Sequence, residues 1–538
     1  MQHSFPLAVC FFMTTLPPSL AISHRTEQCD VIVAGGSTAA LAAAIAAARD
    51  NSQLHVCLTE PTDWLGGQMT SGGVPAIDFG SLNRQAAYQP RDFADMMASF
   101  GGGNPGACWV STKCYLPRHL VEGWIARTVR GFSNLNVFYN SVIKRVQRQG
   151  RVISAVEAVQ RVPRSGFDQW GQRLSDTWQD WYSESDSHGL TKTLLRLEGR
   201  HSLVVVDATE VGDVLVLSQA SFHQGAETPT ETSLNTLDTC GQAFTFPFYI
   251  QNGGKSGVHV SSGKPATFNL EGQDWGHVWS YRRVQHGTGQ YHASSPGDVS
   301  NQNWGGGNDY KDRYIFLPLQ ETLQQRSDWQ GGVNIAAVRE AEDRAYGYYN
   351  YYVSIAPSDV RDSLSMAGPD VTGTGTGLSK IPYLRDSRRS VGLQGYQLQK
   401  ADFAKEVPGT YGVRYPDTVA LGDYKYADVH GVHNCPYPHY VNVPAIKPFY
   451  IPFRSLTNQD VDNLLVAGKT MAVSFMANAA TRMHPMEWNT GMAAGLASSI
   501  MASKHMTSQQ LYHDVTTLQN KLRAETSLDW TQPRDGAR

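Results

Sequence analysis

The segment 30–49 constrains the fold of this chain more than any other stretch. A short apolar run at residues 30–34 ends in Gly35 and Gly36, and an alanine-rich run with helical composition follows at 38–49. Strand, glycine turn and helix in this order begin a dinucleotide-binding βαβ unit, in which the turn lets the backbone approach a pyrophosphate. The sequence therefore predicts a Rossmann-like α/β domain that binds an adenine dinucleotide.

The glycine fingerprint of this turn is imperfect, because Ser37 and Ala40 occupy its second and third glycine positions. A second strand, expected over residues 53–60, ends in Glu60 at the distance typical of such units. A carboxylate there accepts both hydroxyl protons of the adenosine ribose and repels a 2′-phosphate. The pattern thus favours FAD or NAD over NADP.

A second glycine-rich stretch, residues 64–73, follows directly and contains Gly66 and Gly67. Such a loop brings backbone N–H groups to a pyrophosphate or an isoalloxazine edge without Cβ clashes. A domain that binds NAD alone has no need of it. A flexible surface loop is the alternative.

Residues 33–49 and 60–72 together resemble the FAD-dependent oxidoreductase family of the two-dinucleotide-binding-domain flavoproteins, which is distantly related to the fumarate reductase flavoproteins. Members of that family usually have Thr-Pro-Ala-Gly where this chain has Ser-Thr-Ala-Ala at residues 37–40. The resemblance implies FAD as the cofactor and a discontinuous Rossmann-like FAD-binding domain with an inserted α+β substrate domain.

Later segments carry the same resemblance. Residues 207–213 match the family's Asp-Ala-Thr-x-x-Gly-Asp element, and 463–469 match Asn-Leu-Leu-Val-Ala-Gly-Arg with Lys469 for Arg. Residues 482–495 match its Arg-x-x-Pro and Gly-Gln-Ala-Ala-Gly elements. We expect a helix to begin near Asn489, so that its free N–H groups and positive dipole end stabilise the negative charge of reduced flavin. A small-residue helix selected for close packing is the alternative.

The resemblance implies a set of cofactor-binding residues, including one strand residue that contacts the adenine. They are Gly35, Gly36, Ser37, Thr38, Ala40, Glu60, Gly66, Gly67, Gln68, Met69, Thr70, Val142, Ala208, Thr209, Gly212, Asp213, Gly468, Asn489, Thr490, Gly491 and Met492.

The predicted domain boundaries follow the change in sequence character. Residues 25–227 and 445–510 form the FAD-binding domain, 228–444 the substrate or cap domain, and 511–538 a C-terminal helix and tail. The polar stretch 163–190 holds three tryptophans and is interpreted as an inserted packing loop.

The candidates for substrate anchoring and proton handling lie in the central region. Tyr383 and Arg385 belong to a stretch that resembles the family's Tyr-x-Arg-Glu-x-Arg-Arg, and arginine offers fixed bidentate donors. A structural Arg–Asp network is the alternative. His430 and His433 are further candidates; their spacing fits no standard zinc pattern, so no metal is assigned, although a metal site and ordinary loop histidines stay open.

The first 24 residues resemble a secretory signal peptide, although they lack a basic first segment. Removing Cys10 with it leaves six cysteines, an even number that suits an oxidising compartment, and Cys108–Cys114 is the favoured disulfide. We therefore expect a secreted or periplasmic protein. No other run approaches the length of a membrane helix.

The expected function is hydride transfer between a small organic substrate and flavin N5, with oxygen or an electron carrier as acceptor. A net charge of −3 gives no indication of nucleic-acid binding, and the sequence leaves the oligomeric state open. Two alternatives are a flavin-dependent isomerase or lyase without net redox, and a degenerate, non-enzymatic carbohydrate-binding scaffold.

Overall fold

A computed structural model describes the chain from residue 22 to residue 526, except for short gaps. The gaps are 83, 101–107, 112, 228–236, 254–257, 259–267, 286–291, 434, 436–439 and 444–445. Most of the predicted signal peptide and the tail from residue 527 lie outside the described residues.

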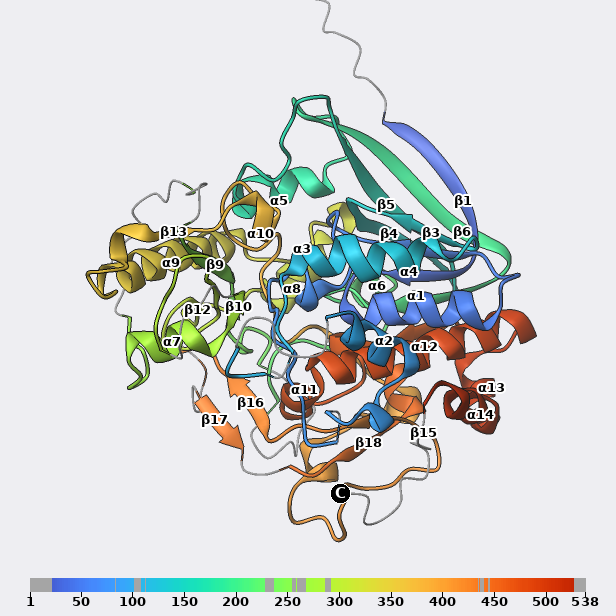
Figure 1. Cartoon of the computed structure of the whole chain (residues 1–538). Helices are drawn as coiled ribbons and strands as arrows, with labels where there is room; N and C mark the ends of the chain where they lie inside the picture. The colour runs from blue at the N-terminus through green and yellow to red at the C-terminus, as the bar shows by residue number, and fades with distance from the viewer. Residues whose placement is uncertain are drawn as a thin grey trace, which may run out of the picture.

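One seven-stranded sheet lies at the centre of the part of the molecule that is expected to bind FAD, residues 25–227 and 445–510 (Figure 1). Its order is β3-β2-β1-β6-β5-β4, and β19 also pairs with β6. The pairs β3–β2, β2–β1, β1–β6 and β19–β6 are parallel, whereas β4–β5 and β5–β6 are antiparallel. The strands are β1 (Ser23–Ala34), β2 (Val56–Thr59), β3 (Leu135–Phe138), β4 (Ser141–Gln149), β5 (Val152–Pro163), β6 (Leu190–Asp207) and β19 (Leu464–Val466). The Rossmann-like α/β prediction is confirmed, and β19 brings the C-terminal part back to the first sheet.

Two buried helices pack against each other beside this sheet, as Figure 1 shows: α1 (Thr38–Asp50) and α12 (His484–Lys504). Small side chains permit this contact. A Cβ on Gly491 would lie 2.2 Å from the carbonyl oxygen of Ala39, and one on Gly495 would lie 2.2 Å from that of Ala43. The amphipathic pattern of residues 508–525 predicts one closing helix, but the structure has two, Ser508–His513 and Val515–Glu525, which are separated at Asp514.

The other helices outside the central region 228–444 are shorter than α1 and α12. They are α2 (Arg91–Ser99), α3 (Pro117–Leu120), a π-helical turn (Val121–Ile125), α4 (Ala126–Arg130), α5 (Leu174–Tyr182), α6 (Asp213–Leu217), α11 (Phe475–Thr481), α13 (Ser508–His513) and α14 (Val515–Glu525).

The central region has an α+β character. A four-stranded antiparallel sheet, β10-β11-β9-β13, lies on the side of the molecule away from α1 and near the long helix α9 (Figure 1). Small strand pairs surround it. The elements are α7 (Trp275–Tyr281), α8 (Leu319–Gln324), α9 (Ile335–Ser354), α10 (Pro369–Thr372), β7 (Phe222–His223), β8 (Phe244–Thr245), β9 (Phe248–Asn252), β10 (Arg283–Gln285), β11 (Val299–Gln302), β12 (Asp309–Tyr310), β13 (Leu364–Met366), β14 (Arg389–Ser390), β15 (Thr418–Gly422), β16 (Ala427–His430), β17 (Tyr440–Val443) and β18 (Phe449–Pro452).

Two of these pairs join strands from either side of an expected boundary: β7–β14 across the one near residue 227 and β15–β18 across the one near residue 445. The exact domain boundaries therefore stay a prediction.

The structure corrects one strand prediction. The apolar and aromatic residues of 137–142 predict a single strand, but β3 ends at Phe138 and β4 begins at Ser141. Between them Asn140 has a positive φ of 54° and turns the chain. Asparagine tolerates this left-handed conformation better than most residues, which explains why the apolar run is interrupted there.

All six cysteines expected in the mature chain form disulfides. The favoured pair Cys108–Cys114 is confirmed, and the other two are Cys29–Cys57 and Cys240–Cys435. Cys29–Cys57 joins the neighbouring strands β1 and β2, and both of its residues are fully buried.

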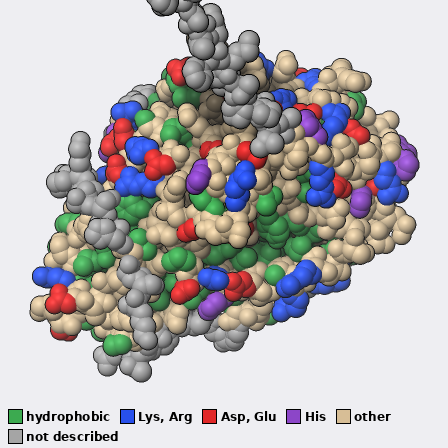
Figure 2. All heavy atoms as spheres, turned by 90° about the horizontal axis from the view of Figure 1, so that it is seen from above, with side chains coloured by type: hydrophobic (Ala, Val, Ile, Leu, Met, Phe, Trp, Pro, Cys, Tyr) green, Lys and Arg blue, Asp and Glu red, His purple; other side chains and the backbone are tan. Residues whose placement is uncertain are grey.

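Charges of both signs are interspersed over the face seen in Figure 2, in keeping with the small net charge of −3. None of the described helices has the length and apolar character needed to cross a membrane.

Candidate cofactor and substrate sites

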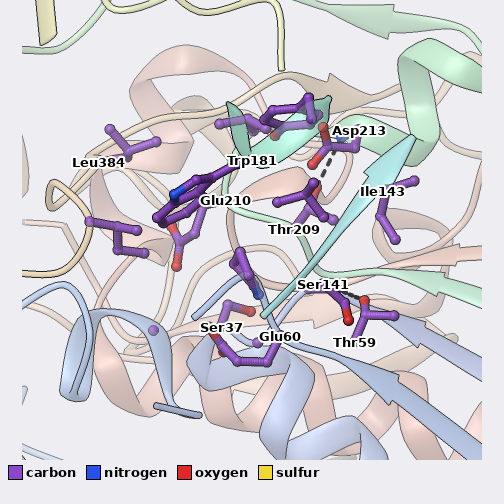
Figure 3. Close-up of a pocket in the computed structure, with 18 of the residues that line it drawn as sticks. Ser37, Thr59, Glu60, Ser141, Ile143, Trp181, Thr209, Glu210, Asp213 and Leu384 are labelled. Atoms are coloured by element: carbon purple, nitrogen blue, oxygen red, sulfur yellow. Dashed lines mark hydrogen bonds between the residues drawn. The ribbon is translucent and has the colours of Figure 1, made fainter. Parts of the chain in front are cut away.

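A cavity of about 710 Å³ lies beside the carboxyl ends of the parallel strands, where ligands bind in open α/β sheets. The turn after β1, the end of β2, the start of β4, the 207–213 segment and α5 all contribute to its wall (Figure 3). Its lining residues are Gly35, Gly36, Ser37, Thr59, Glu60, Pro61, Gly67, Ser141, Val142, Ile143, Trp178, Trp181, Tyr182, Thr209, Glu210, Val211, Asp213, Ile315, Ile381, Pro382 and Leu384.

Glycines bring the walls of this cavity close together. Gly35 has a φ of +90°, and a Cβ there would lie 2.6 Å from the Cα of Thr209. A Cβ on Gly67 would lie 2.7 Å from the Cα of Ser37. The second glycine loop is therefore packed onto the first turn, and the alternative of a flexible surface loop is wrong.

The first turn of α1 is fixed by side chains as well. Ser37 is the N-cap: its hydroxyl accepts from the N–H of Ala40 at 3.1 Å and donates to the carbonyl of Ala208 at 2.7 Å. Thr38 donates to the carbonyl of Gly66 at 2.8 Å, and the N–H of Gly66 donates to Gly36. The Ser37 side chain is thus occupied structurally, and its backbone at the helix N-terminus is what remains to meet a phosphate.

Glu60 lies in the cavity wall beside the glycine turn. One carboxylate oxygen, Oε1, accepts from the N–H and the hydroxyl of Thr62, both at 2.6 Å. The other, Oε2, is buried and has no hydrogen-bond partner among the described residues. A Cβ on Gly36 would lie 1.4 Å from Oε2, so this oxygen lies directly over the turn. Burial raises the pKa of Glu60 to about 8.

The 207–213 segment is held by its own acidic residues. Asp207 accepts from the backbone N–H and the hydroxyl of Thr209 and from the N–H of Leu215. Asp213 accepts from the indole N–H of Trp329 at 2.6 Å, and burial raises the pKa of Asp213 to about 7. These bonds fix Thr209 and Asp213 in the cavity wall.

Lys469, which replaces the family's arginine, links the cavity wall to α12. Its ammonium group lies 2.8 Å from Glu210 on the wall and 2.8 Å from Glu487 in the first turn of α12. The other carboxylate oxygen of Glu210 is buried without a hydrogen-bond partner among the described residues.

Eight predicted cofactor residues line the cavity, and the others lie behind it or elsewhere. Those in the lining are Gly35, Gly36, Ser37, Glu60, Gly67, Val142, Thr209 and Asp213. Those outside it are Thr38, Ala40, Gly66, Gln68, Met69, Thr70, Ala208, Gly212, Gly468, Asn489, Thr490, Gly491 and Met492.

The expected helix start at Asn489 is wrong. Helix α12 begins at His484, with Pro485 in its first turn, a position that proline favours because its missing N–H has no partner there in any case. The amide of Asn489 donates to the carbonyl of Leu421, and the hydroxyl of Thr490 donates to that of Met486. Close packing against α1 therefore explains the small residues of this helix.

Sequence reasoning missed the aromatic wall of the cavity. Trp178, Trp181 and Tyr182 belong to α5, inside the stretch interpreted as a packing loop. In Figure 3, Trp181 and Leu384 lie across the cavity from Ser37 and Glu60. The available signal was the presence of three tryptophans in an otherwise polar segment.

A second, polar cavity of about 1420 Å³ adjoins the segment 381–385. Ile381, Pro382 and Leu384 line the first cavity, whereas Tyr383 and Arg385 line the second. Thr245 and Tyr383 form an antiparallel bridge, so the chain is locally extended and the side chains of residues 382–385 alternate between the two cavities. The segment therefore separates the two cavities.

Ion pairs connect the candidate catalytic residues along the polar cavity. Arg385 lies 2.7 Å from Asp309, and the two ring nitrogens of His430 lie 3.0 Å from Asp309 and 3.0 Å from Asp428. Arg482 continues the chain: it lies 3.0 Å from Asp428 and donates to the hydroxyl oxygen of Tyr383 at 2.5 Å. The structure thus brings Tyr383, Arg385 and His430 together.

In this network, burial and the neighbouring basic side chains shift the pKa values of the acidic groups in opposite directions. Burial alone would raise the pKa of Asp309, but Arg385 and His430 outweigh it and hold that pKa far below its usual value. Burial would likewise raise the pKa of Asp428, but His430 and Arg482 outweigh it and lower that pKa. Burial raises the pKa of Tyr383, so its phenol keeps its proton at neutral pH.

Two further side chains of the cavity are notable. Burial raises the pKa of Asp78 to about 6, although Arg282 and Arg482 oppose it. The Nε of Arg482 and the indole nitrogen of Trp304 are buried donors without a hydrogen-bond partner among the described residues. The sequence identified Arg482 only as the arginine of the family's Arg-x-x-Pro element. Its place in this cavity follows from the tertiary structure.

His433 is not part of this arrangement. Its side chain is 55% exposed and lies 3.2 Å from Asp312. The neighbouring Cys435 is in a disulfide. Within the described ranges, no group of three or more histidine, cysteine, aspartate or glutamate side chains is placed to hold a metal ion.

A family model described as "FAD dependent oxidoreductase" matches residues 30–166 and 196–522. The chain belongs to this family. It is therefore an FAD-dependent oxidoreductase, and the predicted cofactor and enzyme class are confirmed. Among curated protein sequences, none matches the chain.

Solved structures with some similarity include several flavoproteins. A p-nitrophenol 4-monooxygenase from Pseudomonas putida DLL-E4 is 11% identical, with 94% of this chain and 88% of that chain covered and a TM-score of 0.30. A geranylgeranyl bacteriochlorophyll reductase-like protein from Thermoplasma acidophilum is 9% identical, with 94% and 86% covered and a TM-score of 0.33. The E. coli quinol fumarate reductase FrdA is 11% identical, with 93% and 75% covered and a TM-score of 0.29.

The residues of the first cavity fit FAD, and we call it the cofactor cavity from here on. The buried, unpartnered Oε2 of Glu60 needs hydrogen-bond donors, which the hydroxyl groups of an adenosine ribose supply. The glycine turn leaves the N-terminus of α1 accessible to a pyrophosphate.

Proposed function

We propose that this enzyme transfers a hydride between a small organic substrate in the polar cavity and the N5 atom of FAD. The observation that supports this proposal most is that the side chains of residues 382–385 alternately line the cofactor cavity and the polar cavity. The two cavities therefore adjoin along this segment, and hydride transfer requires the flavin ring of bound FAD to reach past it and contact the substrate in the polar cavity. Bound FAD supplies the hydride chemistry, and the protein positions the reactants.

The residues of the polar cavity have distinct proposed roles. Tyr383 keeps its proton and has its oxygen held by Arg482, so its O–H is placed to donate to a substrate oxygen. His430 is fixed between two carboxylates and acts as a positioning residue for Asp428 and Asp309. Arg385 anchors the same network through Asp309 and the carbonyl of Ala243. His433 has no part in this proposal.

The proposed acceptor is oxygen, as in an oxidase, or an electron carrier, as in a dehydrogenase. Export from the cell is proposed from the N-terminal sequence, and the three disulfides support it because they persist in oxidising compartments. Soluble NADPH is not expected there. A non-redox isomerase or lyase is the second candidate.

Anaerobic titration of the purified enzyme with a panel of small alcohols, amines, sugars and hydroxy acids tests the proposal. A substrate bleaches the flavin absorbance, and air restores it with formation of peroxide if the enzyme is an oxidase. In Tyr383→Phe we expect kcat to fall about 100-fold, the lower end of the range for general acid–base catalysis, with FAD content unchanged. A product of the same mass as its substrate, without flavin reduction, would instead establish the isomerase or lyase.

A further inference from the structure

The helix α5 is an addition to the family pattern. It spans Leu174–Tyr182, and the family model passes directly from residue 166 to residue 196. The stretch joins the antiparallel strands β5 and β6, which a short turn could connect. What this inserted helix contacts therefore bears on this chain in particular.

One side of α5 forms the aromatic wall of the cofactor cavity. Trp178, Trp181 and Tyr182 line the cavity and are buried. The rings of Trp178 and Trp181 are stacked, with centroids 5.9 Å apart and planes at 17°. The guanidinium of Arg161 lies over the Trp181 ring at 4.0 Å. These contacts hold the indole of Trp181 in one orientation.

The other side of α5 is fastened to the central region of the chain. The hydroxyl of Ser175 donates to Glu342 on α9 at 2.6 Å. Arg173, which precedes α5, pairs with Asp343 on α9 at 2.7 Å. The indole N–H of Trp178 donates to the carbonyl of Gln330 at 2.8 Å. The aromatic wall is thus held by residues outside the nucleotide-binding unit.

The place of this wall relative to Glu60 indicates what it contacts. Glu60 lies on the opposite side of the cavity and is the acceptor for the ribose, so the base attached to that ribose has to lie between Glu60 and the far walls. Those walls are Val142 and Ile143 on β4 and the indoles of α5. Apolar and aromatic surfaces bind a planar base well, because every base presents a π-face.

We propose that α5 is an adenine clamp: its tryptophans pack against the adenine of FAD, and α9 holds the helix in place. The clamp gives this chain a determinant of FAD affinity outside its glycine motifs. It rests on FAD as the cofactor and is independent of the proposed hydride transfer.

Binding measurements on the full-length apoprotein test the clamp. FAD affinity is measured by quenching of flavin and tryptophan fluorescence, and ADP, which lacks the flavin, is measured as a competitor. In Trp181→Ala we expect the Kd for FAD to rise about 10-fold, or about 1.4 kcal/mol, and the competition constant for ADP to rise by a similar factor. In Glu342→Gln we expect a smaller rise for both ligands.

Trp170→Ala is the matched control. Trp170 lies in the same inserted segment and contacts Trp181 edge-on at 5.8 Å, but it does not line the cavity. We expect FAD and ADP to bind this variant as they bind the wild type, and far-ultraviolet circular dichroism to confirm that both variants are folded. Wild-type affinity in Trp181→Ala, or weaker FAD binding with unchanged ADP competition, overturns the clamp. Absence of FAD binding by the wild type overturns the cofactor itself.

Discussion

Single residues decide how the cofactor cavity recognises its ligand, and Glu60 is the clearest case. Thr62 satisfies one of its carboxylate oxygens and leaves the other to face the glycine turn. A buried acceptor without a partner is unfavourable in the protein alone, and a ribose hydroxyl bound there would supply the missing hydrogen bond. Burial also raises the pKa of Glu60 to about 8, which makes this residue sensitive to pH.

Glu60→Gln tests this residue. Hydrogen bonds to a charged group contribute about 1.5–3 kcal/mol, so we expect the Kd for FAD to rise at least about 10-fold at pH 8–9, where Glu60 is ionised. Because the folded pKa lies above the ordinary value of 4.5, Glu60 makes the FAD-free protein less stable as pH rises from about 4.5 to about 8. Urea unfolding of the apoprotein across that range should show a shallower loss of stability in the variant. An identical pH dependence in the two proteins contradicts the assignment.

Between elements, the contact of α1 with α12 positions the glycine turn at the start of α1. Gly491 and Gly495 on α12 pack directly on the backbone of α1, and Gly468 approaches Ala39 at the start of the same helix. Glu487 of α12 reaches the cavity wall through Lys469 and Glu210. Helix α12 thus packs behind the cofactor cavity, and none of its residues belongs to the cavity lining, contrary to the expectation that its N-terminus contacts the flavin.

Gly495→Ala tests this contact. The added Cβ would lie 2.2 Å from the carbonyl oxygen of Ala43, so the helices must separate. We expect a loss of about 1–3 kcal/mol in the free energy of unfolding, the usual effect of overpacking, together with weaker FAD binding. Gly123→Ala is the control, since a Cβ at this helical glycine meets nothing within 4 Å. That variant should gain up to about 1 kcal/mol through helix propensity, and equal effects in urea unfolding would contradict the prediction.

Across the whole molecule, distant parts of the chain are joined covalently as well as by packing. The Cys240–Cys435 disulfide spans 195 residues, whereas Cys108–Cys114 spans 6. The chain between these two cysteines contains most of the residues that line the polar cavity, including Tyr383 and Arg385. Closing a longer loop restricts the unfolded chain more strongly, so the two disulfides should differ in their effect on stability.

Two double variants compare the contributions of these two disulfides to the free energy of unfolding. Removing Cys240 and Cys435 by substitution with alanine should lower the free energy of unfolding by about 5 kcal/mol on the chain-entropy model. The same change at Cys108 and Cys114 should lower it by about 2 kcal/mol. Urea unfolding under non-reducing conditions measures both. A larger loss from the short loop would show that local contacts, and not loop closure, set the effect.

Local features of the sequence predicted the cofactor cavity well. The glycine turn, Glu60 and the second glycine loop are local patterns whose backbone requirements hold in almost any surroundings, and the structure places them around one cavity. The helix α12 shows the limit: Pro485 marked its true start, but the small residues from Asn489 onward suggested a later one. Whether small residues serve a ligand or a neighbouring helix depends on what packs against them.

By itself, the sequence determined the Rossmann-like fold, FAD as the cofactor and the family, because these depend on short motifs with fixed spacing. Tertiary structure alone decided which distant residues share a cavity. It joined Tyr383, Arg385 and His430 through Asp309 and Arg482, excluded His433, and turned the tryptophans of 163–190 into a wall of the cofactor cavity. The physical reason is that burial and ion pairing arise between segments far apart in the chain, where spacing along the sequence carries no information about distance.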